Sequence, residues 1–364
     1  MSLPLSAVIY LVTCHTGPAD HFLAFSEVLK EEYEVHILAG GAGLKKLQER
    51  KVEKIESFSL ENKEKAAAIE VAKKCAKAAV VITDVGDSFQ YHLHEALKTH
   101  APKAFRFSYY DNPELFVPGE YFEHATKVMG IAEGVLFANA HHAEEHLPNL
   151  KRGIGYYPLH QAERIALRRQ SEQKALRTDL FKKLGLEEKG QTILMYAGGN
   201  SSVYFDRAFP AFLCFLTELA EVEDLSPFVF VLQQHPAAKG PNRDGRLIEQ
   251  MKEGPNVYLS PFNSEDAQVV ADTMIYYQTS MAPQFVLAGI PTIQASHEVY
   301  EDLLVTNYLC PVATHSRALW QILSNPQTKK IDEQRVCEAL GVKKDWPARL
   351  KGAIEEVLKE ERIK

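Results

Sequence analysis

The stretch TMIYYQTSMAPQFVLAGIPTIQAS, residues 273–296, changes character twice within a short distance. It opens with an apolar, β-rich run and passes into small polar residues, among them Thr279 and Ser280. A helix-length apolar segment follows, and the tripeptide GIP at 289–291 ends it before a second short apolar run. We therefore expect a buried strand, a turn, a short helix and another strand, the order of a βαβ unit.

Small hydroxyl side chains between a buried strand and a helix have a specific use in such a fold. In an open α/β sheet, ligands bind outside the carboxyl ends of the strands. Helix N-termini there offer unpaired N–H groups and a partial positive charge, which attract phosphate. Thr279 and Ser280 are therefore candidates for holding a diphosphate. A simple helix cap explains one of the two hydroxyls equally well, because Ser and Thr are preferred cap residues.

Short β-rich runs alternate with helix-length segments along almost the whole chain. Several runs, such as AVIYLV and FVFVL, are almost wholly apolar, which is typical of parallel strands covered by helices on both faces. Such a pattern predicts two doubly wound, Rossmann-like α/β domains. The expected strands are 7–13, 34–39, 79–83, 103–109 and 134–139 in the first half, and 192–197, 228–233, 256–260, 273–277 and 291–294 in the second.

The division into domains follows from length and composition. A chain of 364 residues is too long for one ordinary core. We place an N-terminal domain at 1–160, a linker helix at 161–190 and a second domain at 191–340. The linker is rich in Arg and Lys, and its leucines recur every fourth residue, so we expect it to dock on one domain. The alternative is peripheral contact of this basic helix with an anionic membrane surface.

Composition excludes several classes of protein. The net charge is −7 and no basic tract is long, so nucleic acid is not an expected partner. Five scattered cysteines without a CxxC pair indicate reduced thiols in a cytoplasmic protein. No signal peptide is recognisable and no apolar run approaches the ~18–20 residues of a membrane-spanning helix. We therefore expect a soluble protein.

Other loops of the second half support a ligand site at the same edge. The strand 192–197 runs into a small-residue loop that contains Gly199 and Asn200, and the strand 228–233 runs into His235. Because all these loops follow strands of one parallel sheet, they are expected to converge on one rim.

Candidate groups for acid–base chemistry lie in the first half. His15 follows the first predicted strand, and imidazole is suited to remove a proton from a hydroxyl near neutral pH. Asp87 and Asp111 also follow strands and are the alternatives, although each could be a cap or turn residue. The aromatic segment 109–121 could form a wall of an acceptor site.

Two short motifs carry less weight. The sequence HAEEH at 142–146 matches a zinc-peptidase pattern and places two histidines on one helix face. No further acidic ligand follows it, so we expect no metal and no other cofactor. The glycines at 40–43 lack the spacing of a dinucleotide fingerprint.

The order of segments resembles that of GT-B glycosyltransferases and the related non-hydrolysing UDP-N-acetylglucosamine 2-epimerases. In that superfamily a helix-capping Ser/Gly segment precedes an acidic residue and then Gly-x-Pro. This chain has Thr279 and Ser280, then Gln284, then GIP at 289–291 in the matching places.

Three further segments carry the resemblance. The sequence VGDS at 85–88 is similar to the Gly-Asp-Thr of the epimerases, and His235-Pro236 to their His-Pro loop. Residues 137–147 resemble their strand and helix before the interdomain link. The resemblance implies a GT-B type fold, with two domains facing across a cleft and the C-terminal helix, 341–364, packing back on the first domain.

Two departures bear on function. Gln284 stands where relatives have an acidic residue that grips the ribose, and it carries no charge. The epimerase stretch His-Val-Glu-Ala-Gly-Leu-Arg has no counterpart, because residues 106–111 occupy that region with other side chains. Sugar transfer needs less, namely a bound diphosphate leaving group and one general base. Transfer is therefore favoured over epimerisation.

The resemblance thus predicts a glycosyltransferase that uses a UDP-linked sugar and an unidentified acceptor, for which a lipid and an envelope glycan are candidates. One alternative is a UDP-sugar 2-epimerase. Another is a degenerate relative that binds a nucleotide or a partner protein without catalysis. In the favoured prediction Gln284 holds the ribose and His15 is the base, while the diphosphate is held by Gly199, Asn200, His235, Thr279 and Ser280.

Overall fold

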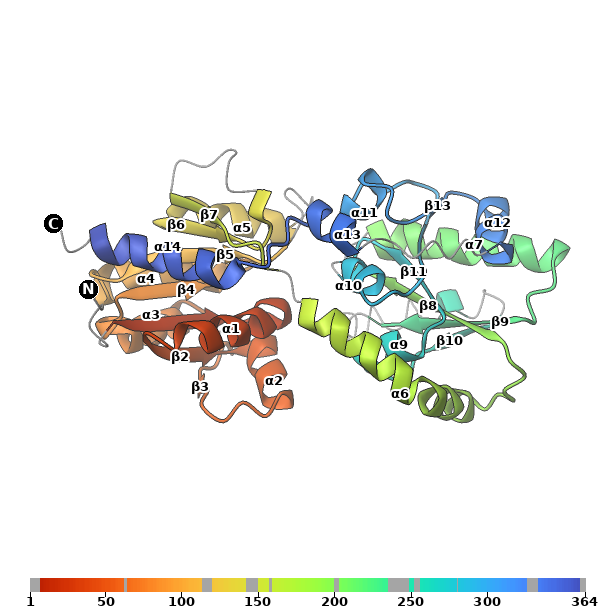
Figure 1. Ribbon diagram of the computed structural model, residues 1–364, viewed down its shortest axis with the longest axis horizontal. Helices are drawn as coiled ribbons and strands as arrows, with labels where there is room; N and C mark the ends of the chain where they lie inside the picture. Colours follow the sequence, from red (N-terminus) through yellow and green to blue (C-terminus); the bar gives the residue numbers. More distant parts are fainter. Residues whose placement is uncertain are drawn as a thin grey trace. The chain divides into compact units, whose positions relative to one another are not determined.

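The computed structural model describes residues 7–61, 64–112, 120–141, 150–156, 159–199, 203–234, 249–251, 256–279, 281–325 and 333–360. The chain divides into two compact units (Figure 1). Unit 1 consists of Met1–Pro158 and Leu340–Lys364, and unit 2 of Leu159–Ala339. Each unit contains one sheet whose paired strands all run parallel, as the alternation of strand and helix predicted.

The sheet of unit 1 has seven strands in the order β3-β2-β1-β4-β5-β6-β7. The chain lays down β1, β2 and β3 toward one side and then returns to place β4 on the other side of β1. Loops that leave β1 and β4 therefore diverge, and the crevice between them is the topological switch point of the sheet. The strands are β1 (Val8–Thr13), β2 (Glu34–Ala39), β3 (Glu56–Ser57), β4 (Val80–Thr83), β5 (Phe105–Tyr110), β6 (Gly134–Phe137) and β7 (Leu150–Gly153).

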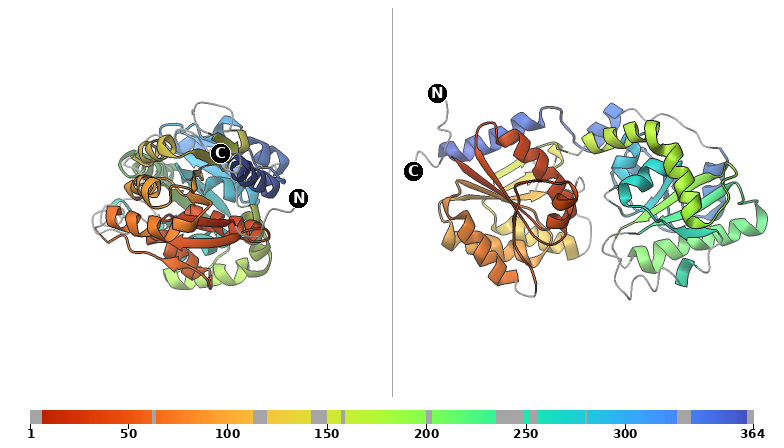
Figure 2. Two further views of the ribbon diagram at one scale, coloured as in Figure 1. Left: turned by 90° about the vertical axis from the view of Figure 1, so that its left-hand side faces the viewer. Right: turned by 90° about the horizontal axis from the view of Figure 1, so that it is seen from below.

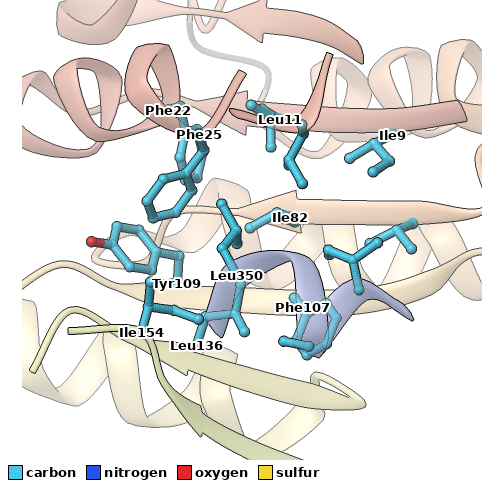
Figure 3. Close-up of a cluster of buried hydrophobic side chains, with 14 of the residues drawn as sticks. Ile9, Leu11, Phe22, Phe25, Ile82, Phe107, Tyr109, Leu136, Ile154 and Leu350 are labelled. Atoms are coloured by element: carbon cyan, nitrogen blue, oxygen red, sulfur yellow. The ribbon is translucent and has the colours of Figure 1, made fainter. Parts of the chain in front are cut away.

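Helices cover both faces of this sheet. Residues of α1 and α14 share one apolar cluster with β1, β4 and β5, and residues of α3 and α4 share another with the opposite face. Figure 3 shows Phe22 and Phe25 of α1 beside Tyr109 of β5, with Leu350 of α14 in the same cluster. The helices are α1 (Thr16–Leu29), α2 (Gly41–Glu49), α3 (Glu64–Lys74), α4 (Ser88–His100), α5 (Glu120–Ile131) and α14 (Trp346–Glu360).

Unit 2 repeats this plan with six strands in the order β10-β9-β8-β11-β12-β13. Its switch point lies between β8 and β11, because β9 and β10 extend the sheet on one side and β12 and β13 on the other. Figure 2 shows the twisted sheet of each unit between helices. The strands are β8 (Thr192–Gly198), β9 (Phe228–Gln233), β10 (Val257–Leu259), β11 (Thr273–Tyr277), β12 (Thr292–Ala295) and β13 (Val312–Ala313).

The helices of unit 2 also form two layers. The helices α7 and α12 bury aromatic and leucine side chains against one face of the sheet. On the other side α6 packs on α9 and α10, and these contact β8 and β12. The helices are α6 (Leu159–Leu184), α7 (Phe209–Val222), α9 (Ser264–Val270), α10 (Ala282–Leu287), α11 (Leu303–Thr306), α12 (Ser316–Ser324) and α13 (Glu333–Ala339).

The basic helix α6 docks on unit 2 through its arginines as well as its leucines. Arg168 bonds to the carboxylates of Glu265 and Asp266, 3.1 and 2.8 Å away, and so ties α6 to the first turn of α9. Arg169 donates to three backbone carbonyl groups at the end of α9. Arg177 bonds to Asp272 just before β11. These guanidinium groups are therefore engaged within unit 2.

The structure differs from the sequence prediction mainly at the sheet edges. All ten predicted strands are present, with ends that differ by a few residues. The strands β3, β7 and β13 were not predicted, because they have only two to four residues and lack a buried apolar run. Within the described part of the chain, no helix combines the length and the apolar character needed to cross a bilayer.

Candidate functional site

The switch point of unit 1 brings together two of the predicted catalytic residues. His15 lies directly after β1 and precedes α1, while Asp87 lies after β4 and caps α4 by accepting a hydrogen bond from Phe89 N at 2.9 Å. The ring atom Nε2 of His15 lies 3.5 Å from Oδ2 of Asp87. Both side chains are about one-third exposed, so each stays accessible to solvent.

A third acidic residue organises this pair. Asp84 follows β4 directly and is completely buried. Its Oδ2 accepts hydrogen bonds from Nδ1 of His15 at 3.1 Å and from the backbone N–H groups of Cys14 and His15 at 2.8 and 3.0 Å. Asp84 is not among the site residues predicted from the sequence. The available signal was its position directly after a buried strand.

The protonation of His15 follows from its two neighbours. Nδ1 faces Asp84 and Nε2 faces Asp87, and only the doubly protonated imidazolium presents an N–H to both. Burial opposes the charge of His15, but the carboxylates of Asp84, Asp87 and Asp111 outweigh it and raise its pKa to about 9. His15 therefore carries a positive charge at neutral pH in this state.

The two aspartates of the pair respond differently to the site. Burial raises the pKa of Asp87, and the nearby charge of His15 offsets only part of that effect. Burial also acts against the ionised form of Asp84, but its contacts with His15 and with other donors lower its pKa overall. Asp84 is therefore a fixed anion, whereas Asp87 is the more basic of the two carboxylates.

Asp111 completes the group in unit 1. It follows β5, and a Cβ added to Gly17 would lie only 2.7 Å from its Oδ2. Asp111 thus lies against the first turn of α1, where the absence of a side chain at Gly17 leaves room for it. All three predicted catalytic residues are therefore near one another, with Asp84 as an addition.

The switch point of unit 2 is formed by backbone. Gly199, directly after β8, donates its N–H to the carbonyl of Tyr277 at 3.1 Å. A Cβ added to Gly199 would lie 2.1 Å from the carbonyl oxygen of Gln278, so only glycine fits. Gln278 has φ +49°, a left-handed conformation that costs free energy for a residue of this kind. Backbone strain of this sort is concentrated at functional sites.

The helix after Gly199 begins irregularly. Tyr204–Ala208 forms a π-helical turn that continues into α7. A Cβ added to Gly198 would overlap the ring of Tyr204, so that glycine makes room for the aromatic side chain. Single π-turns of this kind occur frequently at functional sites.

The structure describes only some of the other residues predicted to bind the nucleotide. Thr279 Oγ1 accepts a hydrogen bond from Met281 N at 3.3 Å. Met281 is itself the N-cap residue of α10, and no side chain caps that helix, so Thr279 does not have the cap role given as its alternative. Gln284 donates its amide N–H to Gln161 of α6 at 3.1 Å, so one side of that amide is occupied within the protein. The remaining three residues, Asn200, His235 and Ser280, lie outside the described residues.

A pocket of about 380 Å³ opens next to the switch point of unit 2. It lies between the start of the π-turn and the loop that follows β12. Arg207 and Glu298 face each other across it, with 3.6 Å between Nη1 and Oε1. None of its residues was singled out from the sequence, since they lie in unrelated segments. Its lining is Asp206, Arg207, Pro210, Ala211, Cys214, Tyr277, Ser296, His297 and Glu298.

The structure corrects the predicted aromatic wall at its first two residues. Tyr109 and Tyr110 belong to β5 and are buried. Tyr109 packs on Phe22 and Phe25 of α1 and hydrogen-bonds His21 at 2.7 Å, so neither ring is available to an acceptor. Residues 113–119 and the HAEEH motif at 142–146 lie outside the described part of the chain. Among the residues that are described, no group of three or more His, Cys, Asp and Glu side chains is arranged to hold a metal.

Comparison by sequence finds no family model and no curated protein that matches this chain. Comparison by structure finds many solved proteins with the same fold. The UDP-GlcNAc 2-epimerase from Neisseria meningitidis, solved with UDP-GlcNAc bound, superposes with a TM-score of 0.68 at 10% identity, over 97% of this chain and 100% of that one.

Two other solved structures show the range of the neighbours. The UDP-GlcNAc 2-epimerase from Methanocaldococcus jannaschii gives a TM-score of 0.67 at 9% identity, covering 96% of this chain and 99% of its own. A glycosyltransferase from Rickettsia africae gives 0.61 at 14% identity, covering 97% and 99%. The predicted GT-B-like fold is thereby confirmed; identities this low establish the fold alone.

Proposed function

We propose that the protein is a glycosyltransferase that moves a sugar from a UDP-linked donor to a hydroxyl group of an acceptor. The observation that carries this proposal is the pair formed by His15 and Asp87 at the switch point of unit 1. Ligand-binding loops of open α/β sheets lie at such points. A cation and a partly exposed carboxylate of raised pKa are the groups that proton transfer requires there.

The donor is assigned to unit 2. The loop at Gly199 leads into the π-turn and α7, and N–H groups at the start of a helix attract a diphosphate. Thr279 and the strained backbone at Gln278 lie directly beside that loop. Asn200, His235 and Ser280 remain proposed diphosphate ligands on the sequence argument. Gln284 keeps an amide oxygen with which it can accept a hydrogen bond from a ribose hydroxyl.

In this proposal Asp87 is the general base that accepts the proton of the acceptor's hydroxyl group. His15 already holds a proton on each ring nitrogen, so at neutral pH it cannot act as a base. Asp87 takes the proton as the acceptor oxygen bonds to the anomeric carbon and the bond to the diphosphate oxygen breaks. The charge of His15 stabilises the site while the proton moves. In this proposal His15 is the charged partner of the base, and the base itself is Asp87, one of the two alternatives to His15 in the sequence prediction.

A UDP-sugar 2-epimerase is the second candidate, and the names of the structural neighbours favour it. Against it stands the segment that occupies the epimerase acid–base region. There Arg106 belongs to β5 and bonds to Glu133 at 3.1 Å and to the carbonyl of His94, which are contacts within the fold. The free thiols of all five cysteines are compatible with a cytoplasmic setting for either reaction.

Two measurements test the proposal. A thermal-shift screen with UDP, CDP, GDP, ADP and TDP should show stabilisation by UDP, about 2.7 kcal/mol at 100-fold above its dissociation constant. Incubation with UDP-GlcNAc and no acceptor, followed by NMR, separates the candidates. Slow release of UDP supports a transferase, whereas UDP-ManNAc would identify an epimerase. No shift with any of the five nucleotides would remove both.

A further inference from the structure

Asp84 stands out among the buried polar groups of unit 1 because of its surroundings. Its side chain is 1% exposed, and the groups that bond to it are donors. Besides the ring of His15 and the two backbone N–H groups, Thr13 Oγ1 donates to Oδ2 at 2.9 Å, and the amide of Gln90 donates to Oδ1. The two backbone N–H groups can only donate, and with the other contacts of Asp84 they favour its ionised form, whose pKa is lowered overall.

A buried carboxylate is costly, so its contacts indicate what it does. Removing an anion from water costs several kcal/mol, which is recovered only where hydrogen bonds replace the lost hydration. Here the replacement comes almost entirely from one loop: Thr13 ends β1, and the N–H groups of Cys14 and His15 follow it. The anion therefore holds the backbone of the β1–α1 loop as well as the ring of His15.

We propose that Asp84 is the positioning residue of this site, which fixes the β1–α1 loop and presents His15 to Asp87 with a proton on each ring nitrogen. The hydrogen bond to Nδ1 sets the rotation of the ring, and that rotation directs Nε2 toward Asp87. Asp84 is fully buried and therefore not accessible from the solvent. It acts through His15.

The charged groups around His15 come from three elements. Asp84 follows β4, Asp87 begins α4, and Asp111 follows β5. Of these only Asp84 is fully buried and bonded directly to the ring. We therefore expect loss of Asp84 to remove both the hydrogen bond that orients the ring and the strongest attraction for its positive charge, and we expect loss of Asp87 or Asp111 to have a smaller effect.

The experiment is the titration of His15 by ¹⁵N and ¹³C NMR in the full-length protein. In the wild-type protein at pH 7 both ring nitrogens should show imidazolium shifts, with a midpoint near pH 9. The nearly isosteric Asp84→Asn removes the negative charge, and the midpoint should fall by at least ~1 unit. The matched control is Thr13→Val, which removes one hydrogen bond from the same carboxylate and leaves the ring contact. Its midpoint should stay within ~0.3 unit of the wild type.

Three outcomes would overturn the proposal. They are a neutral His15 in the wild-type protein at pH 7, a midpoint unchanged by Asp84→Asn, and an equal fall in Thr13→Val, which would mean that the loop had merely loosened. If Asp84→Asn does not fold, the wild-type ring shifts and the control still decide. The inference rests on the proposed function only in giving the protonated His15 a role in sugar transfer. Because these measurements need neither donor nor acceptor, failure of the transferase assay would leave the titration result standing.

Discussion

The pH dependence of stability gives the sharpest test of the charged site in unit 1. A histidine whose pKa is raised from 6.5 to about 9 binds its proton more tightly in the folded chain than in the unfolded chain. The stabilisation is therefore complete below pH 6.5 and is lost as the pH rises through about 9. The shift alone would correspond to about 3 kcal/mol. Since the ring is 32% exposed, solvent screening should reduce this to roughly 1–2 kcal/mol.

The perturbation is His15→Gln, which keeps polarity and removes the titrating group. The free energy of unfolding should differ between wild type and His15→Gln by a constant amount below pH 6.5, and the difference should shrink by ~1–2 kcal/mol between pH 6.5 and 9.5. Groups that titrate in this range without interacting with His15 are common to both proteins and cancel in the difference.

The chain offers a local probe for this measurement. It has two tryptophans, and Trp346 packs on Tyr156 in unit 1 at a ring separation of 4.6 Å, while Trp320 packs in unit 2. In a Trp320→Phe background, fluorescence during urea unfolding reports on unit 1 alone. A difference that stays flat from pH 6 to 10, or that grows with pH, would refute the protonated state of His15.

Three further predictions concern unit 2. Gly199→Ala should abolish UDP binding, because its Cβ would lie 2.1 Å from a backbone carbonyl oxygen; calorimetry measures the loss. Replacing Thr279 and Ser280 together with Ala should weaken UDP binding by more than the ~1 kcal/mol that loss of a cap removes from stability. Arg168→Met should lower the stability of unit 2 by ~2 kcal/mol, since it breaks a partly buried ion-pair network, whereas Glu172→Gln at its exposed partner should cost under ~0.5 kcal/mol.

Each of these three predictions has an outcome that would contradict it. Normal UDP affinity in Gly199→Ala would show that the loop after β8 does not contact the nucleotide. If the double alanine variant binds UDP normally and only melts earlier, the two hydroxyls have a structural role only. If Arg168→Met and Glu172→Gln lower the free energy of unfolding equally in urea, followed by Trp320 fluorescence, the contacts of Arg168 with α9 contribute nothing measurable.

The sequence predicts the centre of each sheet well and its edges poorly. Central strands such as β1 and β9 are buried on both faces, so their apolar runs are visible without any structural knowledge. Edge strands have no such requirement. In β7, the residues Leu150–Gly153 include two cations, and cations on an edge strand protect it from pairing with other chains. A pattern that marks burial therefore cannot mark these strands.

Among the site residues, position along a strand was the informative feature. His15 and Asp87 could be found because a polar side chain just after a buried strand must lie at the carboxyl edge of the sheet. Asp84 obeys the same rule, but its role depends on which strands are neighbours, and the order β1 beside β4 is not written in local sequence. The two tyrosines at the end of β5 misled for a related reason: their burial against α1 is set by tertiary packing.

Unit 1 is built from two pieces of chain separated by the whole of unit 2. Its final piece carries α14, whose side chains Leu350, Ile354 and Val357 lie in the same core as β1 and α1. During synthesis on the ribosome, residues up to 158 emerge first, yet this core stays open on one face until the last helix has been translated. Unit 2, which ends at Ala339, has its entire sequence available earlier. We therefore expect unit 2 to complete its folding before unit 1, the reverse of the usual order for an N-terminal domain, and expect the apolar side chains of α1 that pack with α14 to stay exposed until then.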